Sequence, residues 1–155
     1  MAFTFVFLTD QFYEDYLSCA EIEQKRDRPH VRMLIHAEGL DFAIPMRSHI
    51  RHPNAYITNT KDSCGIDYSK AVVITDHARY IDTAKQPHIR QDEFDALRGK
   101  EYIVEQGMIR YLKQYRKALA KPDVPRNAMI LKYSTLQYFH QYILKGSSDQ
   151  SASGK

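Results

Sequence analysis

The sequence contains no tryptophan, only two cysteines and six glycines, and no long apolar run. Cys19 and Cys64 lie far apart and form no CxxC pair, which argues against a disulfide framework and against a zinc site. No glycine-rich phosphate loop, HExxH pair or GxSxG elbow occurs, so nucleotide-driven chemistry, metal hydrolysis and acyl transfer have no local signature. No stretch approaches the roughly 20 apolar residues of a membrane helix. These absences favour a cytoplasmic protein that uses no metal and no cofactor.

The bulk composition is that of an ordinary globular protein. The 155 residues are 43% hydrophobic and 26% charged, which suits one domain with a single core. We therefore expect one domain over residues 1–145. The last residues have no apolar anchor, so residues 146–155 are expected to form a disordered tail. The formal net charge of +3 is mildly basic, so the positions of the charges must indicate the partner.

The first half of the chain is patterned for strands. Five stretches carry an alternating or continuous apolar pattern: residues 3–8, 31–38, 40–46, 56–58 and 71–75, the last of which predicts a central strand. Thr9 and Asp10 are good caps for a helix after the first strand, and Glu38-Gly39 predicts a hairpin turn. Pro45 predicts that the second hairpin strand ends there or lies at a sheet edge.

The second half is patterned for helices. Residues 92–98 have helical composition, and residues 100–120 repeat apolar side chains at spacings of three and four. Pro122 and Pro125 are expected to end this long helix, and Ser134 to cap a final one, STLQYFHQYILK. The order predicts an α+β domain built on a curved antiparallel sheet or small barrel, with its longest helix in the C-terminal half.

A cationic cluster follows the predicted hairpin. The stretch FAIPMRSHIRHPNAY gathers five side chains within six positions: Arg47, Ser48, His49, Arg51 and His52. No acidic residue follows until Asp62. Such a cluster at the exit of a strand suits the binding of an anion.

The same residue types suit metal-free cleavage of RNA, in which the 2′-hydroxyl attacks the adjacent phosphate and leaves a 2′,3′-cyclic phosphate. This reaction needs a base, an acid and donors for the charge on the phosphorane. Histidine suits the proton transfers because its reference pKa lies near neutrality, and the planar fork of arginine suits the phosphate. Ser48 would add a hydroxyl donor. Lys70 fits a second catalytic cation and an ordinary strand-flanking charge equally well.

Plainer interpretations stay open for the cluster. His49 and His52 also fit exposed loop residues. Arg47 and Arg51 also fit an inorganic anion or the carboxylates of a protein partner. Ser48 also fits an ordinary turn.

Other basic residues extend the candidate RNA surface. They are Lys25, Arg26, Arg28 and His30 in a basic loop, and Lys113, Arg116 and Lys117 on the outer side of the long helix. The helix cations also fit a solvated surface, and His30 also fits a partly buried, hydrogen-bonded imidazole. The 11 tyrosines could stack unpaired bases, although most are needed in the core.

The segments RPHVRMLIHAEGLDFAIPMRSHIRH and CGIDYSKAVVI resemble the ToxN/AbiQ/TenpN group of type III toxin-antitoxin endoribonucleases, most closely its TenpN branch. The resemblance extends from the first strand to the STLQYFHQY segment. It implies a strongly curved antiparallel sheet like the SH3-like barrel of MazF-type toxins, with packed helices. It also implies metal-independent cleavage of RNA at preferred sequences, and inhibition by a small structured RNA that is encoded as repeats and processed by the toxin.

In the ToxN branch, the second hairpin strand is followed by a Pro-x-Thr-Ser segment and a lysine, and a basic residue precedes the hairpin. The matching positions here are Pro45, Ser48 and Arg28. Arg47 replaces the threonine, and Ile50 with Arg51 beside it takes the place of the lysine. Because of these departures the roles known in the family do not transfer whole. We expect Ser48 and Arg47 to contact the scissile phosphate, His49 or His52 to exchange a proton, and Arg28, Arg51 and Lys70 to supply positive charge.

The sequence thus predicts an endoribonuclease toxin that forms a closed assembly with its antitoxin RNA. A non-catalytic RNA-binding module that uses the same basic loop and tyrosines is the alternative. A protein-interaction domain is the third hypothesis.

Overall fold

The computed structural model describes residues 3–23 and 30–144, which form an α+β fold. The first half contains β1 (Thr4–Leu8), α1 (Asp10–Asp15), β2 (Arg32–Ala37), β3 (Leu40–Arg47), β4 (Ala55–Asn59), β5 (Cys64–Asp67), the 3-10 helix η1 (Tyr68–Lys70), β6 (Val72–Val73), α2 (His77–Tyr80) and β7 (Ile81–Asp82). The second half contains α3 (Gln91–Leu97), α4 (Glu101–Ala120), α5 (Pro125–Tyr133), the 3-10 helix η2 (Thr135–Tyr138) and α6 (His140–Ile143). The predicted α+β class with its longest helix in the second half is confirmed. The predicted tail and the basic residues Lys25, Arg26 and Arg28 lie outside the described residues.

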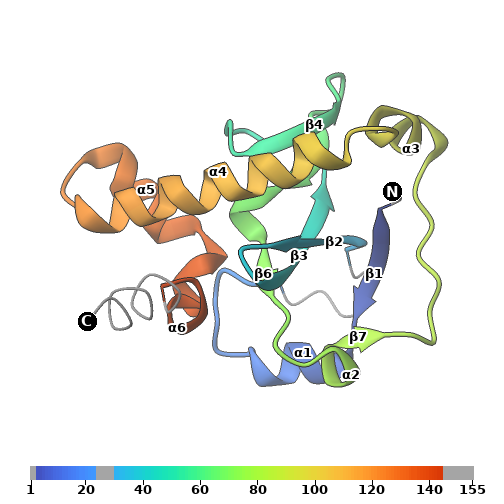
Figure 1. Cartoon of the computed structure of the whole chain (residues 1–155), viewed down its shortest axis with the longest axis horizontal. Coiled ribbons are helices and arrows are strands. Elements are labelled where there is room, and N and C mark those ends of the chain that lie inside the picture. The colour runs from blue at the N-terminus through green and yellow to red at the C-terminus, as the bar shows by residue number, and fades with distance from the viewer. Residues whose placement is uncertain (1–2, 24–29, 145–155) are drawn as a thin grey trace.

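The strands of the described chain form one antiparallel sheet with an open path (Figure 1). The strand order is β4-β5-β3-β2-β1-β7, and β6 pairs with β3 beside this path. The predicted antiparallel sheet is therefore confirmed. Closure into a small barrel is wrong for the described residues, because β4 and β7 end the path and do not pair with each other.

The β2–β3 hairpin is the scaffold of the site. Its register runs from the pair Arg32 and Pro45 to the pair Ala37 and Leu40. The turn residues Glu38 and Gly39 have φ angles of 53° and 77°, the left-handed values that tight hairpin turns require. The predicted turn is therefore confirmed.

β3 continues through Pro45 to Arg47, so the prediction that it ends at the proline or lies at an edge is wrong. β2 flanks it on one side, and β6 and then β5 flank it on the other. The N–H of Met46 donates to Val31 on the β2 side, so the nitrogen of Pro45 faces the opposite side. Pro45 lies between the part of β3 that pairs with β6 and the part that pairs with β5. Its lack of an N–H therefore costs the sheet no hydrogen bond.

α4 packs along the sheet and contacts β2, β4 and η1 (Figure 1). Its buried stripe confirms the predicted helix and comprises Val104, Gly107, Met108, Tyr111, Leu112, Tyr115 and Ala118. The hydroxyl of Tyr68, at the start of η1, donates to the carbonyl of Val104 over 2.8 Å. This contact fixes η1 against the middle of the helix.

Two elements are shorter than the stretches that predict them, FYEDYLSCAEIEQ for the first helix and AVVIT for a central strand. The helix after β1 ends at Asp15, because Tyr16 makes the last helical hydrogen bond and the Leu17 N–H turns to Glu14 in a tighter turn. The run at residues 71–75 is largely buried, but Val72 and Val73 alone pair, and only with β3. It is therefore not a central strand.

The C-terminal helices also differ from the prediction. Pro125 begins α5 instead of only ending α4, because the first turn of a helix needs no N–H from that residue. Ser134 caps η2 by accepting a hydrogen bond from the N–H of Leu136. The Thr135 hydroxyl donates to the carbonyl of Ala71, and the non-helical Phe139 separates η2 from α6. The single final helix that the sequence suggested is therefore divided.

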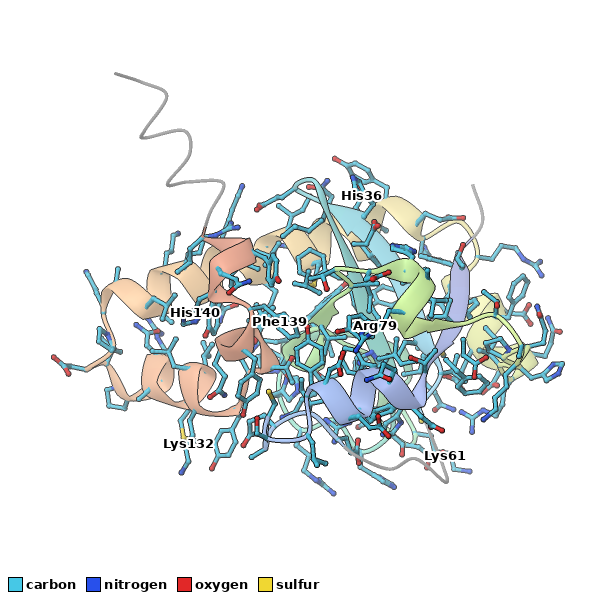
Figure 2. All side chains as sticks on the ribbon, turned by 90° about the horizontal axis from the view of Figure 1, so that it is seen from below. His36, Lys61, Arg79, Lys132, Phe139 and His140 are labelled. Carbon is cyan, nitrogen blue, oxygen red and sulfur yellow. The ribbon has the colours of Figure 1, made fainter. Side chains whose placement is uncertain are left out.

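One hydrophobic core joins the sheet to these helices. It contains Phe12, Met33, Phe42, Leu112 and Phe139, and Figure 2 shows Phe139 in the interior of the molecule. Across the described ranges, no helix has the length and apolar character needed to cross a membrane.

Gly107→Ala is expected to lower the free energy of unfolding by about 1–3 kcal/mol, the usual cost of overpacking a core. A Cβ at this position would lie 2.2 Å from the Tyr68 hydroxyl oxygen. At an open helix position the same change would instead stabilise by roughly 0.5–1 kcal/mol. Urea denaturation checks the sign, with the exposed Gln114→Ala as the control within α4. A Gly107→Ala protein as stable as the wild type would contradict the packing of η1 on α4.

Candidate functional site

A buried carboxylate, Asp67, lies beside the cationic cluster. Arg47 and Asp67 lie diagonally across the β3–β5 pair, because Arg47 is opposite Gly65 in the register. Arg47 Nη1 donates to Asp67 Oδ2 over 2.8 Å, and the Asp67 side chain is fully buried while that of Arg47 is 32% exposed. The end of β3 is therefore held by an ion pair in which the carboxylate is buried and the guanidinium is partly exposed.

Asp67 accepts several further hydrogen bonds. The hydroxyl and the N–H of Ser69 donate to Oδ1 over 2.6 and 3.0 Å, and His52 Nε2 lies 3.2 Å from the same oxygen. Burial raises the pKa of Asp67, but the hydrogen bonds from His52, Ser69 and Arg47 outweigh it, so the net pKa lies below its ordinary value. Asp67 is thus a stable anion that binds two of the predicted catalytic residues, Arg47 and His52.

His52 has both ring nitrogens engaged. The backbone N–H of Asn54 donates to Nδ1 over 3.1 Å, so Nδ1 is unprotonated in this arrangement. The proton of the ring is then on Nε2, where Asp67 and Ser69 are the neighbours. His52 therefore supports Asp67, and proton exchange with a substrate would first require its release.

A cavity of about 200 Å³ lies on the sheet face that carries Arg47; we call it the arginine cavity. It is lined by Ala20, Glu21, Ile22, Glu23, His30, Arg32, Pro45, Arg47, Lys70 and Thr135. Arg32 and Pro45 are paired in the hairpin and Arg47 follows two residues later, so the register places all three on one face. The hairpin therefore supplies two guanidinium groups to one cavity.

Arg32 is the more unusual of these two arginines. Its residue is 2% exposed, and its Nη1 donates to the carbonyls of Ala43 and Lys70 over 3.3 and 3.4 Å. Burial lowers the pKa of Arg32, an effect that Tyr13 and Glu23 partly offset. Within residues 3–23 and 30–144, its Nε has no hydrogen-bond partner and no carboxylate forms an ion pair with it. A buried cation of this kind favours an anion in the cavity.

The other cations of the arginine cavity have acidic partners. Lys70 Nζ donates to Glu21 over 3.1 Å and to the carbonyl of Tyr133 over 2.8 Å. His30 Nε2 lies 2.5 Å from a carboxylate oxygen of Glu23. Arg47 is likewise paired, with Asp67, so Arg32 is the cation of this cavity whose charge is least compensated within the described residues.

A second cavity, of about 300 Å³, opens on the other side of His30 and Arg47; we call it the serine cavity. It is lined by His30, Val31, Met46, Arg47, Ser48, Cys64, His88, Ile89, Arg90 and Glu93. Burial raises the pKa of Glu93, and Arg90, whose Nε lies 3.1 Å away, partly offsets this. Two histidines, His30 and His88, thus share a cavity with Ser48 and Arg47.

The rest of the cluster follows a strained loop. His49 has a φ of 56°, and its N–H donates to the carbonyl of Asp62, while the N–H of Ile50 donates to Ser63. His49 and Arg51 are exposed, whereas Ile50 is buried and anchors the loop. Neither His49 nor Arg51 lines the arginine cavity or the serine cavity.

The helix cations lie apart from these cavities. Arg116 binds Glu38 with Nη2 over 2.6 Å and the carbonyl of Ile143 over 2.7 Å, so it has a structural role. Lys113 is exposed, and Lys117 lines a separate groove between α4 and α5. Of the predicted site residues, the structure therefore gathers five around the two cavities and Asp67: Arg47, Ser48, His52, Lys70 and His30.

Four residues of the site were not predicted. Arg32 and Asp67 become neighbours of the cluster only through strand register, while Glu23 and His88 come from distant segments. Asp67 alone has a local signal, since a strand followed by Asp-Tyr-Ser is typical of an aspartate that caps a short helix. The burial of Arg32 has no such signal.

Asp67→Asn is expected to lower the free energy of unfolding by about 1–3 kcal/mol at neutral pH, because buried donors lose a charged acceptor. The native pKa of Asp67 is depressed, so its contribution is present above the unfolded value and is lost as the pH falls through the native one. The stability difference should therefore be constant above about pH 5 and shrink below about pH 4. Chemical denaturation between about pH 2.5 and about pH 7 measures this stability difference. Asp123→Asn at an exposed turn is the control, and a difference independent of pH would contradict the depressed pKa.

In the part of the chain that the structure describes, no group of three or more His, Cys, Asp or Glu side chains could hold a metal ion. No family model, curated protein or solved structure matches the chain.

Proposed function

We propose that this protein is a metal-independent endoribonuclease, the toxin of a type III toxin-antitoxin system. The observation that carries the proposal is the position of Arg47, which lines both cavities and is held by the buried Asp67. A phosphate at Arg47 would be accessible to the buried Arg32 on one side and to Ser48 on the other.

The phosphate is bound by guanidinium groups. Arg47 uses one nitrogen for Asp67 and presents the remainder of its fork to the cavities. Arg32 supplies a desolvated positive charge, which acts more strongly than the same charge in water. Lys70 adds a third cation, and the hydroxyl of Ser48 donates to a phosphate oxygen. Together these groups stabilise the extra charge of the phosphorane.

The protons are moved by His30 and His88. Both line the serine cavity with Ser48 and Arg47, and Glu23 holds the Nε2 side of His30. One imidazole removes the proton of the 2′-hydroxyl and the other protonates the departing 5′-oxygen. His52 has the role of holding Asp67, and through it Arg47, in place. This assignment departs from the expectation that His49 or His52 exchanges the proton.

The partners follow from the same proposal. The substrate is single-stranded RNA, the inhibitor is a small structured RNA processed by the toxin, and the two form a closed assembly in the cytoplasm. We also propose that the sheet is strongly curved like that of MazF-type toxins, although its strand path is open and not closed into a barrel. Short tandem repeats upstream of the reading frame would support the assignment of the inhibitor.

The purified protein is expected to cleave RNA in the presence of EDTA and to leave 2′,3′-cyclic phosphate ends. Ser48→Ala and Arg47→Lys should each lower the cleavage rate by about 10²–10³-fold, as is usual when one preorganised donor is lost. Mass spectrometry of the products identifies the ends. A requirement for added divalent metal would refute the proposal. If the protein binds RNA with an affinity that falls as salt rises but leaves the RNA intact, the non-catalytic RNA-binding module would be favoured.

His30→Ala and His88→Ala are expected to lower the cleavage rate by about 10²–10⁴-fold each, the usual contribution of a general acid or base. The wild-type pH profile of kcat/KM should have two limbs, and each variant should lose one of them. His36→Ala is the matched control, since Figure 2 shows His36 at the edge of the molecule and its side chain is 69% exposed. If His49→Ala or His52→Ala removed a limb while His30→Ala did not, the assignment of His30 would be wrong.

A further inference from the structure

A third cavity lies between η1 and α5, and we call it the tyrosine pocket. It has a volume of about 230 Å³, and its lining includes His52, Asn54 and Ser69 on one side and Tyr111, Met129 and Tyr133 on the other. Met129 and Tyr133 are 56% and 44% exposed, so they form the open side of the pocket. α5, which carries both residues, has no buried residue of its own.

The pocket combines apolar walls with one available amide. His52, Ser69 and Tyr111 already have hydrogen-bond partners within the protein. The side-chain amide of Asn54, by contrast, has none among residues 3–23 and 30–144, where only its backbone is bonded. An amide can both donate and accept, and this one has no hydrogen bond to the described residues, so it is available to a ligand.

η1 separates this pocket from the arginine cavity. Ser69 lines the tyrosine pocket and the next residue, Lys70, lines the arginine cavity. Lys70 Nζ also donates to the carbonyl of Tyr133, so the two cavities share a wall. A charged site and an apolar site therefore adjoin each other across a single turn of chain.

We propose that the tyrosine pocket holds one unpaired nucleobase of the RNA whose phosphate lies at Arg47. The RNA in this statement rests on the proposed function. Unpaired bases are recognised by stacking on aromatic side chains and by hydrogen bonds to their edges, which Tyr133 and Asn54 supply. The pocket is smaller than the roughly 300–1,000 Å³ of sites for drug-sized ligands, which suits one base. Asn54 would then set which base is preferred, and so the cleavage sequence.

Methyl NMR of methionine tests the pocket without any cleavage. The chain has five methionines; Met129 lines the tyrosine pocket, Met46 lines the serine cavity, and Met33 and Met108 are fully buried. The probes are the four uncharged ribonucleosides, which carry no phosphate. One of them is expected to shift the Met129 methyl in a saturable way and to leave Met33 and Met108 unchanged.

Asn54→Ala should lower the affinity for this nucleoside by about tenfold, which corresponds to about 1.4 kcal/mol of binding free energy. Tyr133→Ala should also lower this affinity. The substitution keeps the backbone carbonyl of residue 133, which accepts from Lys70. Tyr102→Ala, which removes a 72% exposed tyrosine of α4, is the control and should change nothing. In cleavage assays, Asn54→Ala should relax the base preference.

Three results would overturn the inference: no shift of Met129 with any nucleoside, an equal shift with p-cresol, or unchanged affinity in Asn54→Ala. The second would indicate a pocket for an apolar protein side chain. RNA cleavage without nucleoside binding would refute the base pocket and leave the proposed function in place. Nucleoside binding without cleavage would refute the nuclease and leave the pocket.

Discussion

The buried carboxylate of Asp67 is the interaction on which the site depends. It is fully buried, and it remains an anion because His52, Ser69 and Arg47 all direct donors toward it. Removing such a group would leave several donors without their charged acceptor at a position that is itself fully buried. The ladder that brings Asp67 to Arg47 thus determines the direction of the Arg47 guanidinium, and with it the place where an anion can bind.

Charge in this site is arranged by depth. Asp67 and Arg32 are buried, Arg47 and Lys70 are half-buried, and the uncharged Ser48 is exposed. Burying a cation such as Arg32 is unfavourable unless a negative charge accompanies it. The proposed phosphate would supply this negative charge, so substrate binding would relieve a cost that folding incurs.

The sequence was sufficient for two elements that depend on neighbouring residues, the hairpin turn and the long helix. Glu38-Gly39 gave the hairpin turn, and the apolar spacing of residues 100–120 gave α4, because each pattern is local. The interpretation of Pro45 failed because it depended on which strands flank β3. For the same reason the cluster seemed free of acids: Asp67 and Glu23 are brought to it only by the fold. Arg32 alternates with apolar residues on a strand, a pattern that does not indicate its burial, yet it is buried and lines the arginine cavity.

The brevity of η1 has a consequence for how this protein can vary. A 3-10 helix advances by about 120° for each residue, since it has about 3.0 residues per turn. Neighbouring side chains therefore enter different compartments, as Ser69 and Lys70 do. Deletion of one residue here would move Lys70 to the position of Ser69 and place a lysine against apolar walls. The number of residues between Asp67 and Ala71 therefore determines which side chain enters each cavity. It also determines where the Thr135 hydroxyl can bond to the carbonyl of Ala71.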